Sequence, residues 1–199
     1  MFKFMQKGSK ILALFVALIM TSFVCIDVSF FAINANAQMV IPPKGRLSLS
    51  RSGHSAYITE NGELYTWGVN YYGELGYGID TPVSLMPKKI MDNALQVSLG
   101  EYCSACITEN GDLYTWGHNN CGQLGDGSTT DSYMPKKIMN NISQVSIGRY
   151  NSACITENGD LYIWGNIVDS QLGDGSMTNR YTPEKIMSNV LYVSLGGMH

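Results

Sequence analysis

Downstream of residue 46, apolar side chains come in short runs that Gly, Asn, Asp or Pro interrupt. None of these runs keeps the helical spacing of every third or fourth position, so helices are not expected there. In the stretch 97–144 the runs predict four strands, at 97–99, 104–108, 113–116 and 136–139, the last one after Pro135. Short strands joined by turns predict an all-β fold.

These strands belong to a unit that the chain repeats. The residues 108–117, TENGDLYTWG, return with few changes at 59–68 and 156–165, and their tryptophans, Trp67, Trp116 and Trp164, are 49 and 48 residues apart. Four short antiparallel strands at such a period are typical of a β-propeller blade. We therefore predict a β-propeller fragment with about three four-stranded blades and the start of a fourth.

Each copy carries an Asn-Gly pair between its second and third strands, and the glycines are Gly62, Gly111 and Gly159. Asn-Gly favours a type I′ hairpin turn, in which both central residues have positive φ. Because this pair and the tryptophan after it do not vary among the copies, we interpret them as hairpin and packing residues of the blade. They are not interpreted as a binding motif.

The repeats divide the chain into an extended lead-in at 38–46 and three full units at 47–96, 97–144 and 145–192. Residues 193–199 repeat the start of the unit, and we interpret them as a truncated fourth copy. The remaining blades are then expected from a longer chain or from self-association, because a partial ring leaves the faces and edges of its end blades uncovered.

The first 37 residues differ in character from the repeats. Three lysines precede a nearly continuous apolar run at 11–26, and Ala-Asn-Ala at 35–37 places small residues at a cleavage site. This order predicts a helical signal peptide at 1–37, and hence a secreted or cell-surface protein that meets the membrane only transiently. The length of the run also fits an uncleaved anchor, which Asp27 and the cleavage site disfavour.

The charge balance argues against nucleic acid as a partner. The formal net charge of the 199 residues is −3, and it becomes −5 without residues 1–37, which hold three Lys and one Asp. A mildly acidic surface without a basic cluster is a poor match for a phosphate backbone. We expect no nucleic-acid ligand, and we expect the lysine pairs 88–89 and 136–137 to be solvated.

No motif predicts catalysis, a metal ion or a cofactor. Cys103 and Cys106 have redox spacing, but side chains three residues apart on a strand point in opposite directions, and no helix N-terminus lowers a thiol pKa there. No second Cys or His pair completes a zinc site. Asp126-Gly127-Ser128 lacks the further carboxylates of a calcium loop. Neither His54 nor His118 lies in a known motif with a nucleophile, so we expect no enzymatic activity.

A set of residues at fixed spacing runs through 46–199. In the second copy it consists of Gly100, Ile107-Thr108, Tyr114-Thr115-Trp116-Gly117, Asn119, Gly122-Gln123-Leu124-Gly125-Asp126-Gly127 and Pro135. In this pattern the chain resembles the regulator of chromosome condensation repeat family. The resemblance implies a seven-bladed propeller, of which this chain would hold about three blades.

The resemblance leaves the function open. The family histidine is present as His54 and His199, but Cys103 and Asn151 replace it in the second and third copies. The namesake of the family is a nuclear protein that promotes nucleotide exchange on a small GTPase, whereas a secreted bacterial relative inhibits β-lactamases by protein contact. An export signal and an acidic surface fit the secreted type better, although fold-level analogy does not establish function.

The loops that vary among the copies are the candidate binding site. Because neighbouring strands are antiparallel, the loop between strands one and two and the loop between strands three and four leave the blade on one face. Aromatic side chains in such loops can anchor a partner. The candidate binding residues are Tyr71, Tyr72, Tyr102, His118, Asn120, Arg149 and Tyr150. Drift of unconstrained loops explains the variation equally well.

Together these patterns predict an exported, non-enzymatic β-propeller repeat module for protein–protein interaction or cell-surface adhesion. Its partner would be an unknown protein or cell-surface ligand. The alternatives are a secreted protein inhibitor of an enzyme and a carbohydrate-binding module. An inhibitor would bind one enzyme tightly in a defined ratio, whereas an adhesion module would be followed by further cell-surface domains.

Overall fold

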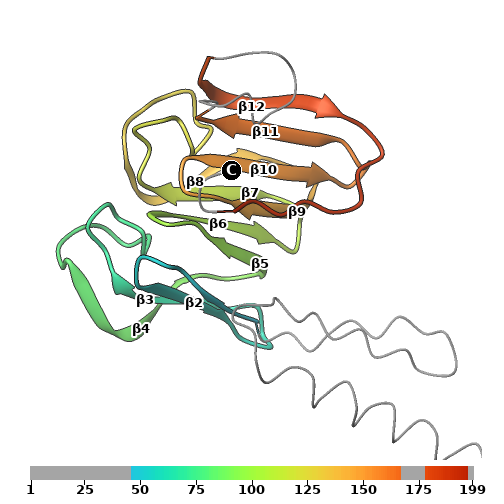
Figure 1. The fold of residues 1–199 in the computed structure, drawn as a ribbon. Helices are drawn as coiled ribbons and strands as arrows, with labels where there is room; N and C mark the ends of the chain where they lie inside the picture. Colours follow the sequence, from blue (N-terminus) through green and yellow to red (C-terminus); the bar gives the residue numbers. More distant parts are fainter. Residues whose placement is uncertain (1–45, 167–177, 197–199) are drawn as a thin grey trace, which may run out of the picture. The chain divides into compact units, whose positions relative to one another are not determined.

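The computed structural model describes residues 46–166 and 178–196. They form three antiparallel sheets of four strands, and each strand pairs with its neighbours in the sequence (Figure 1). This arrangement confirms the prediction of an all-β fold with three propeller-like blades. The expected signal helix at 1–37 lies outside the described residues, and among the described ones no helix has the length and apolarity needed to cross a membrane.

The three sheets use the same part of the repeat. The first consists of β1 (Arg46–Leu49), β2 (His54–Ile58), β3 (Leu64–Val69) and β4 (Val83–Met91). The second consists of β5 (Ala94–Leu99), β6 (Cys103–Thr108), β7 (Leu113–Gly117) and β8 (Ser132–Met139). The third consists of β9 (Ile142–Ile147), β10 (Asn151–Thr156), β11 (Leu161–Gly165) and β12 (Arg180–Met187).

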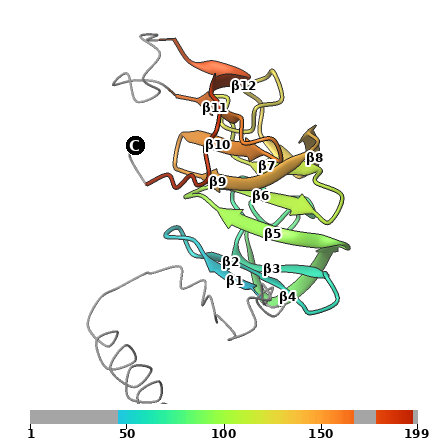
Figure 2. The ribbon, with the colours of Figure 1, turned by 90° about the vertical axis from the view of Figure 1, so that its right-hand side faces the viewer.

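The sheets follow one another in chain order, as Figure 2 shows. Contacts between them are made by their first two strands: β1 and β2 lie against β5, and β5 and β6 lie against β9. The fourth strands β4, β8 and β12 form the outer edges of the sheets. Within 46–166 and 178–196, the main strand contacts of each sheet are therefore with its neighbours in the series, as in a propeller.

Two strands of the second sheet begin earlier than predicted. β5 begins at Ala94, and β8 begins at Ser132, so Pro135 lies inside β8 instead of before it. Proline is tolerated there because β8 is an edge strand, whose outward N–H groups have no strand partner. Pro87 and Pro183 hold the same place in β4 and β12. The outer edges are thereby protected against pairing with a further strand.

The Asn-Gly turn is not the type I′ turn that we predicted. The three glycines have φ between 75° and 81°, but the asparagine before each of them does not have positive φ. In the first hairpin the Gly62 N–H donates to Thr59 O and the Thr59 N–H donates to Glu63 O, both at 3.0 Å. These bonds define a three-residue loop with one left-handed glycine, another common hairpin connection.

The same turn fastens each sheet to the next one. The Gly62 carbonyl accepts a hydrogen bond from Ala94 N–H at 2.8 Å, and the Asn93 carbonyl accepts one from Glu109 N–H at 2.8 Å. Asn93 has a φ of 56°, in the left-handed region that asparagine adopts more readily than most residues. Equivalent bonds join the second and third sheets. The Asn-Gly ends of the blades therefore form one main-chain network.

At the opposite ends of the blades, a tryptophan reaches a main-chain oxygen of the preceding sheet. Trp116 Nε1–H donates to Glu74 O at 2.8 Å, and the Ser104 hydroxyl donates to the same oxygen at 2.9 Å. One repeat later, Trp164 Nε1–H donates to Gln123 O at 2.8 Å. Both indoles are fully buried. We term this pair of bonds to one carbonyl the tryptophan latch.

Apolar cores fill the space between the sheets. Side chains alternate along β6, so Cys106 packs with Trp116 against the first sheet, whereas Cys103 packs with Ile107 against the third. Burial raises the pKa of both thiols to about 12. These two cysteines therefore lack both the shared face and the thiolate that a redox motif requires.

Gly76→Ala is expected to destabilise the fold more than Gly78→Ala. Both glycines have left-handed φ, 78° and 96°, so both changes carry a similar backbone cost. A Cβ at position 76 would lie 2.9 Å from Nε1 of Trp116, whereas one at position 78 would have no neighbour within 4 Å. Chemical denaturation should show an additional loss of about 1–3 kcal/mol for Gly76→Ala. Equal losses for the two variants would argue against the tryptophan latch.

Candidate functional site

The candidate binding residues lie in loops at the latch end of the blades. We define the loop face by the loops 50–53, 100–102 and 148–150, which join the first two strands of the three sheets, and by 70–82 and 118–131, which join the last two strands of the first and second sheets. The equivalent loop of the third sheet includes 167–177, which lie outside the described residues.

A buried asparagine organises each long loop. Asn119 Oδ1 accepts a hydrogen bond from Leu124 N–H at 2.9 Å, and its Nδ2 donates to the carbonyls of Ser128 and Thr130. Asn70 is bonded in the same way in the first sheet, to Leu75 N–H and to two carbonyls. Both loops are therefore held in a defined conformation by the blade that carries them.

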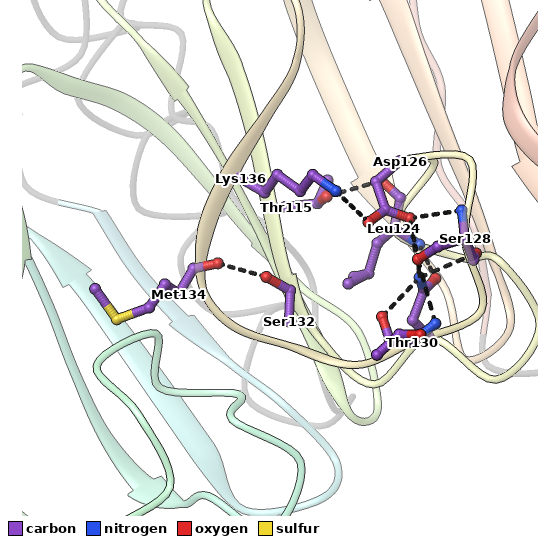
Figure 3. A network of polar contacts seen from close by, with 9 residues as sticks. Thr115, Leu124, Asp126, Ser128, Thr130, Ser132, Met134 and Lys136 are labelled. Carbon is purple, nitrogen blue, oxygen red and sulfur yellow. Dashed lines mark hydrogen bonds and ion pairs between the residues drawn. The ribbon is translucent and has the colours of Figure 1, made fainter.

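The remainder of the loop 118–131 is held by Asp126, as Figure 3 shows. Its carboxylate accepts hydrogen bonds from Ser128 Oγ at 2.8 Å and from Lys136 Nζ at 2.7 Å. Although burial raises the pKa of Asp126, these bonds hold it below its usual value. Groups of the chain itself thus engage both carboxylate oxygens. Among the described residues, no group of three or more His, Cys, Asp or Glu could hold a metal ion.

The lysine pairs are not merely solvated, as we had expected. Lys136 pairs with Asp126, and Lys137 Nζ lies 2.7 Å from Asp112 Oδ1. Lys89 and Lys185 make the same type of contact with the acidic residue that follows the Asn-Gly pair in their own sheets. The pair between this lysine and the acidic residue after Asn-Gly recurs in all three blades, and, being partly exposed, it contributes little to stability.

Three of the predicted binding residues meet across the first two sheets. The ring of Tyr72, from loop 70–82, has its centroid 5.4 Å from that of Tyr102 and 4.3 Å from that of His118. His118 Nδ1 lies 3.0 Å from Asp131 Oδ1, which fixes the orientation of the imidazole. Tyr72 is 37% exposed and its neighbour Tyr71 is 66% exposed, so the cluster presents aromatic surface to solvent.

A second group of predicted residues connects the last two sheets. Arg149 Nε lies 3.1 Å from Glu101 Oε2, and its guanidinium lies over the ring of Tyr150 at 4.8 Å. Glu101 also accepts a hydrogen bond from the Tyr102 hydroxyl, which raises the pKa of Tyr102. A row of side chains therefore crosses all three sheets. We term it the loop ridge: Tyr72, His118, Tyr102, Glu101, Arg149 and Tyr150.

The ridge revises the interpretation of the variable positions. The sequence offered a binding role or the drift of unconstrained loops as explanations, yet several of these residues link neighbouring blades. Sequence reasoning left out Glu101 and Asp131, the carboxylates that hold Arg149 and His118. Glu101 and Arg149 stand at the same repeat position, so opposite charges at equivalent places were an available signal. No feature of the sequence pointed to Asp131. Asn120, another predicted binding residue, is exposed in its loop.

A buried polar cluster connects the first two sheets. His54 is fully buried, with Nε2 3.2 Å from Ser104 Oγ and Nδ1 3.3 Å from Ser52 Oγ. Burial lowers the pKa of His54 to about 4, so the imidazole is neutral at neutral pH. Ser104 and His54 are both fully buried, which makes their contact a structural one.

The fold and its fastening residues match a known repeat. The family model described as "Regulator of chromosome condensation (RCC1) repeat" matches residues 61–107, 110–155 and 158–199. The chain belongs to the RCC1 repeat family. Each match begins at the asparagine of the Asn-Gly pair, so an RCC1 repeat covers the last two strands of one sheet and continues into the next. The sequence repeat thus straddles the contact between two blades.

Solved structures and curated proteins agree with this assignment. Two structures of yeast RCC1 (Prp20), one from a complex with Kap60 and one of the Saccharomyces cerevisiae protein, superpose with a TM-score of 0.64 at 21% and 22% identity. They cover 72% of this chain, which spans 37% and 38% of theirs, and at such identity they show the fold alone. The human E3 ubiquitin-protein ligase HERC2 is 54% identical over 39 residues, 20% of this chain and 1% of HERC2.

Glu74 is the one acidic residue within the buried latch region of the first two sheets. It stands where the second sheet has Gln123, and its Oε1 is buried without a hydrogen-bond partner among the described groups. Burial raises the pKa of Glu74. A folded-state pKa above the unfolded-state value means that folding disfavours the carboxylate. The resulting cost is absent below the unfolded-state pKa and grows as the pH rises through the folded-state pKa.

Glu74→Gln is therefore expected to stabilise the protein. The free energy of unfolding should rise by about 1–2 kcal/mol at neutral pH, because a buried charge is removed, although the new amide leaves its Nε2 unpaired as Gln123 does. The gain should shrink below pH 4.5, the ordinary pKa of the carboxyl. Urea denaturation at both pH values measures the change, and Gln123→Glu is the mirror control, which should lose stability. A gain that is larger at acidic pH would refute the assignment.

Proposed function

We propose that this chain is an exported RCC1-repeat module that binds another protein through its loop face and carries out no reaction of its own. The observation that carries the proposal is the loop ridge, with Tyr72 and the largely exposed Tyr71 at one end. Tyrosine and arginine are the residue types that most often dominate binding energy. Because Asn70 and Asn119 hold the long loops in place, little ordering cost is expected on binding.

The relatives support a protein-binding role. Prp20 has been solved in a complex with Kap60, and it has been characterised for its binding to Gsp1p and histones. Those partners belong to Prp20, and HERC2 has its own ligase activity. The feature proposed for this chain is more general: a propeller surface that contacts another protein. An enzyme inhibitor and an adhesion module are both forms of this role, and the identity and stoichiometry of the partner distinguish them.

Export is proposed on the sequence of the first 37 residues. Lysines, an apolar run and Ala35-Asn36-Ala37 occur in the order of a signal peptide. We accordingly propose that the protein is of the secreted bacterial type within the family and acts outside the cell or at its surface.

The paired substitution Tyr71→Ala with Tyr72→Ala should weaken binding of the partner about 10-fold or more, because two exposed aromatic anchors are lost. A photo-crosslinking amino acid at position 71 identifies the partner, and the same group at position 192 is the reference. Binding of the purified partner is then measured by calorimetry. Tyr192→Ala is the matched control, since Tyr192 is 67% exposed and lies outside the loop face. Unchanged affinity of the double variant would refute the loop face as the binding surface.

Export predicts a defined mature chain. The intact mass of protein recovered outside the producing cells should correspond to a chain that begins at Gln38, because cleavage would follow Ala37. Ala37→Asp should retain the precursor, whereas Ala32→Asp, outside the cleavage site, should not. Protein of full mass that stays in the membrane fraction would favour the uncleaved anchor instead.

A further inference from the structure

We propose that two copies of this chain associate head to tail, with the open face of the first sheet in one copy docking on the third sheet of the other. The open face is the side of the first sheet that points away from the second, and it is formed by Leu47, Leu49, Tyr57, Trp67 and Leu85. This inference is independent of the loop face and of the partner proposed to bind there.

The open face is an exposed copy of a surface that is buried elsewhere in the chain. Leu47, Leu49 and Leu85 are 57%, 66% and 87% exposed. In the second sheet the residues equivalent to Leu47 and Trp67 are Val97 and Trp116, which are buried against the first sheet. The first sheet thus has the side chains of a blade contact but presents them to solvent.

The chain makes that contact twice with the same chemistry. A tryptophan and a serine of the following sheet donate to one carbonyl of the preceding sheet, at Glu74 and again at Gln123. At the inner strands, Gln96 Nε2 donates to Val145 O at 3.0 Å, and Ile147 N–H donates to Ser98 Oγ at 3.1 Å. The two sides of the contact differ, so repeating it between copies gives head-to-tail docking.

The described strands of the third sheet carry the apolar side chains of the matching side. Ala153, Ile155 and Leu161 stand where the first sheet has Ala56, Ile58 and Leu64, which receive Trp116. Its inner strand β9 already holds a segment of the same chain in the place of a following strand. Gln144 Oε1 accepts from Val193 N–H at 2.7 Å, and Ser146 Oγ accepts from Leu195 N–H at 2.9 Å.

An incoming β1 can replace this segment. Residues 47–50, Leu-Ser-Leu-Ser, have the same order of apolar and small side chains as 193–196, Val-Ser-Leu-Gly. The exchange therefore replaces one set of contacts with an equivalent set. It additionally covers Trp67 and Leu85, which have no counterpart in residues 193–196. Pairing through the outer edges is disfavoured because β4, β8 and β12 each contain a proline.

A closed dimer satisfies the geometry. The described sheets of two copies number six, one fewer than the seven blades that the resemblance implies and within the range of about four to eight found in propellers. In such a ring each copy provides one open face and one third sheet, so both exposed surfaces are used. A head-to-tail contact that did not close would instead produce open chains of copies.

The test uses two variants of the full chain, each with one disabled surface. Leu49→Glu with Leu85→Glu disables the open face, and both positions are exposed, so the fold should persist. Gln144→Ala with Ser146→Glu disables the third sheet, because both acceptors of the incoming N–H groups are lost. Native mass spectrometry and sedimentation over a concentration series should give two-copy mass for the wild type and one-copy mass for each variant. Mixing the variants should restore two-copy mass, because one intact contact is available.

Several outcomes would overturn the proposal. The wild type could remain at one-copy mass, the mixture could fail to associate, or the third-sheet variant alone could still dimerise, which would mean that two open faces pair with each other. Met134→Glu, an exposed apolar position on the outer strand β8, is the matched control and should keep two-copy mass. All variants share residues 1–45, so association through that part is equal in each.

A further variant tests the exchange while both docking surfaces stay intact, so its expected gain of association cannot come from a loss of folding. Val193→Asp with Leu195→Asp should release the segment that occupies β9 and shift the equilibrium toward two-copy mass. A shift toward one-copy mass would contradict the exchange of β1 for residues 193–196.

Discussion

The contact between neighbouring sheets depends on one main-chain oxygen, that of Glu74 or Gln123, which accepts hydrogen bonds from a buried tryptophan and a buried serine of the next sheet. A buried indole N–H without an acceptor would carry a desolvation penalty, so this carbonyl must stay in place. This requirement explains the glycines at positions 76 and 125, because a Cβ at either position would come within 2.9 Å of the indole nitrogen. Since the acceptor belongs to the main chain, the side chain at this position can be Glu or Gln.

The repeated features of the fold were predictable because three copies show which residues cannot vary. The repeated Trp116, the Asn-Gly turn at Gly111 and the four short apolar runs led to four-stranded blades, and the structure has them. The hairpin geometry was predicted wrongly, since Asn-Gly also suits a three-residue loop with a single left-handed glycine. Pro135 suggested a strand start because the chemistry of proline alone does not show that an edge strand accepts it.

The candidate site was only partly predictable, because its contacts join loops that lie about 30 to 50 residues apart in the sequence. Tyr72 and His118 were selected because their positions vary among the copies, and Tyr102 as an aromatic residue on the same face, whereas the structure shows that the three meet one another. A comparison of copies shows which positions change, but not which of the changed residues pair across blades. Only the opposite charges of Glu101 and Arg149 at one repeat position gave such a hint.

The direction of the tryptophan latch bears on the order in which the chain can fold. The donors Trp116 and Trp164 lie 42 and 41 residues downstream of their acceptors. As a chain emerges from the ribosome, each tryptophan therefore meets an acceptor loop that has already been synthesised. Growth from the first sheet onward therefore does not require the indoles of Trp116 and Trp164 to wait for a later partner. The latch thus allows assembly in the direction of synthesis, one blade at a time.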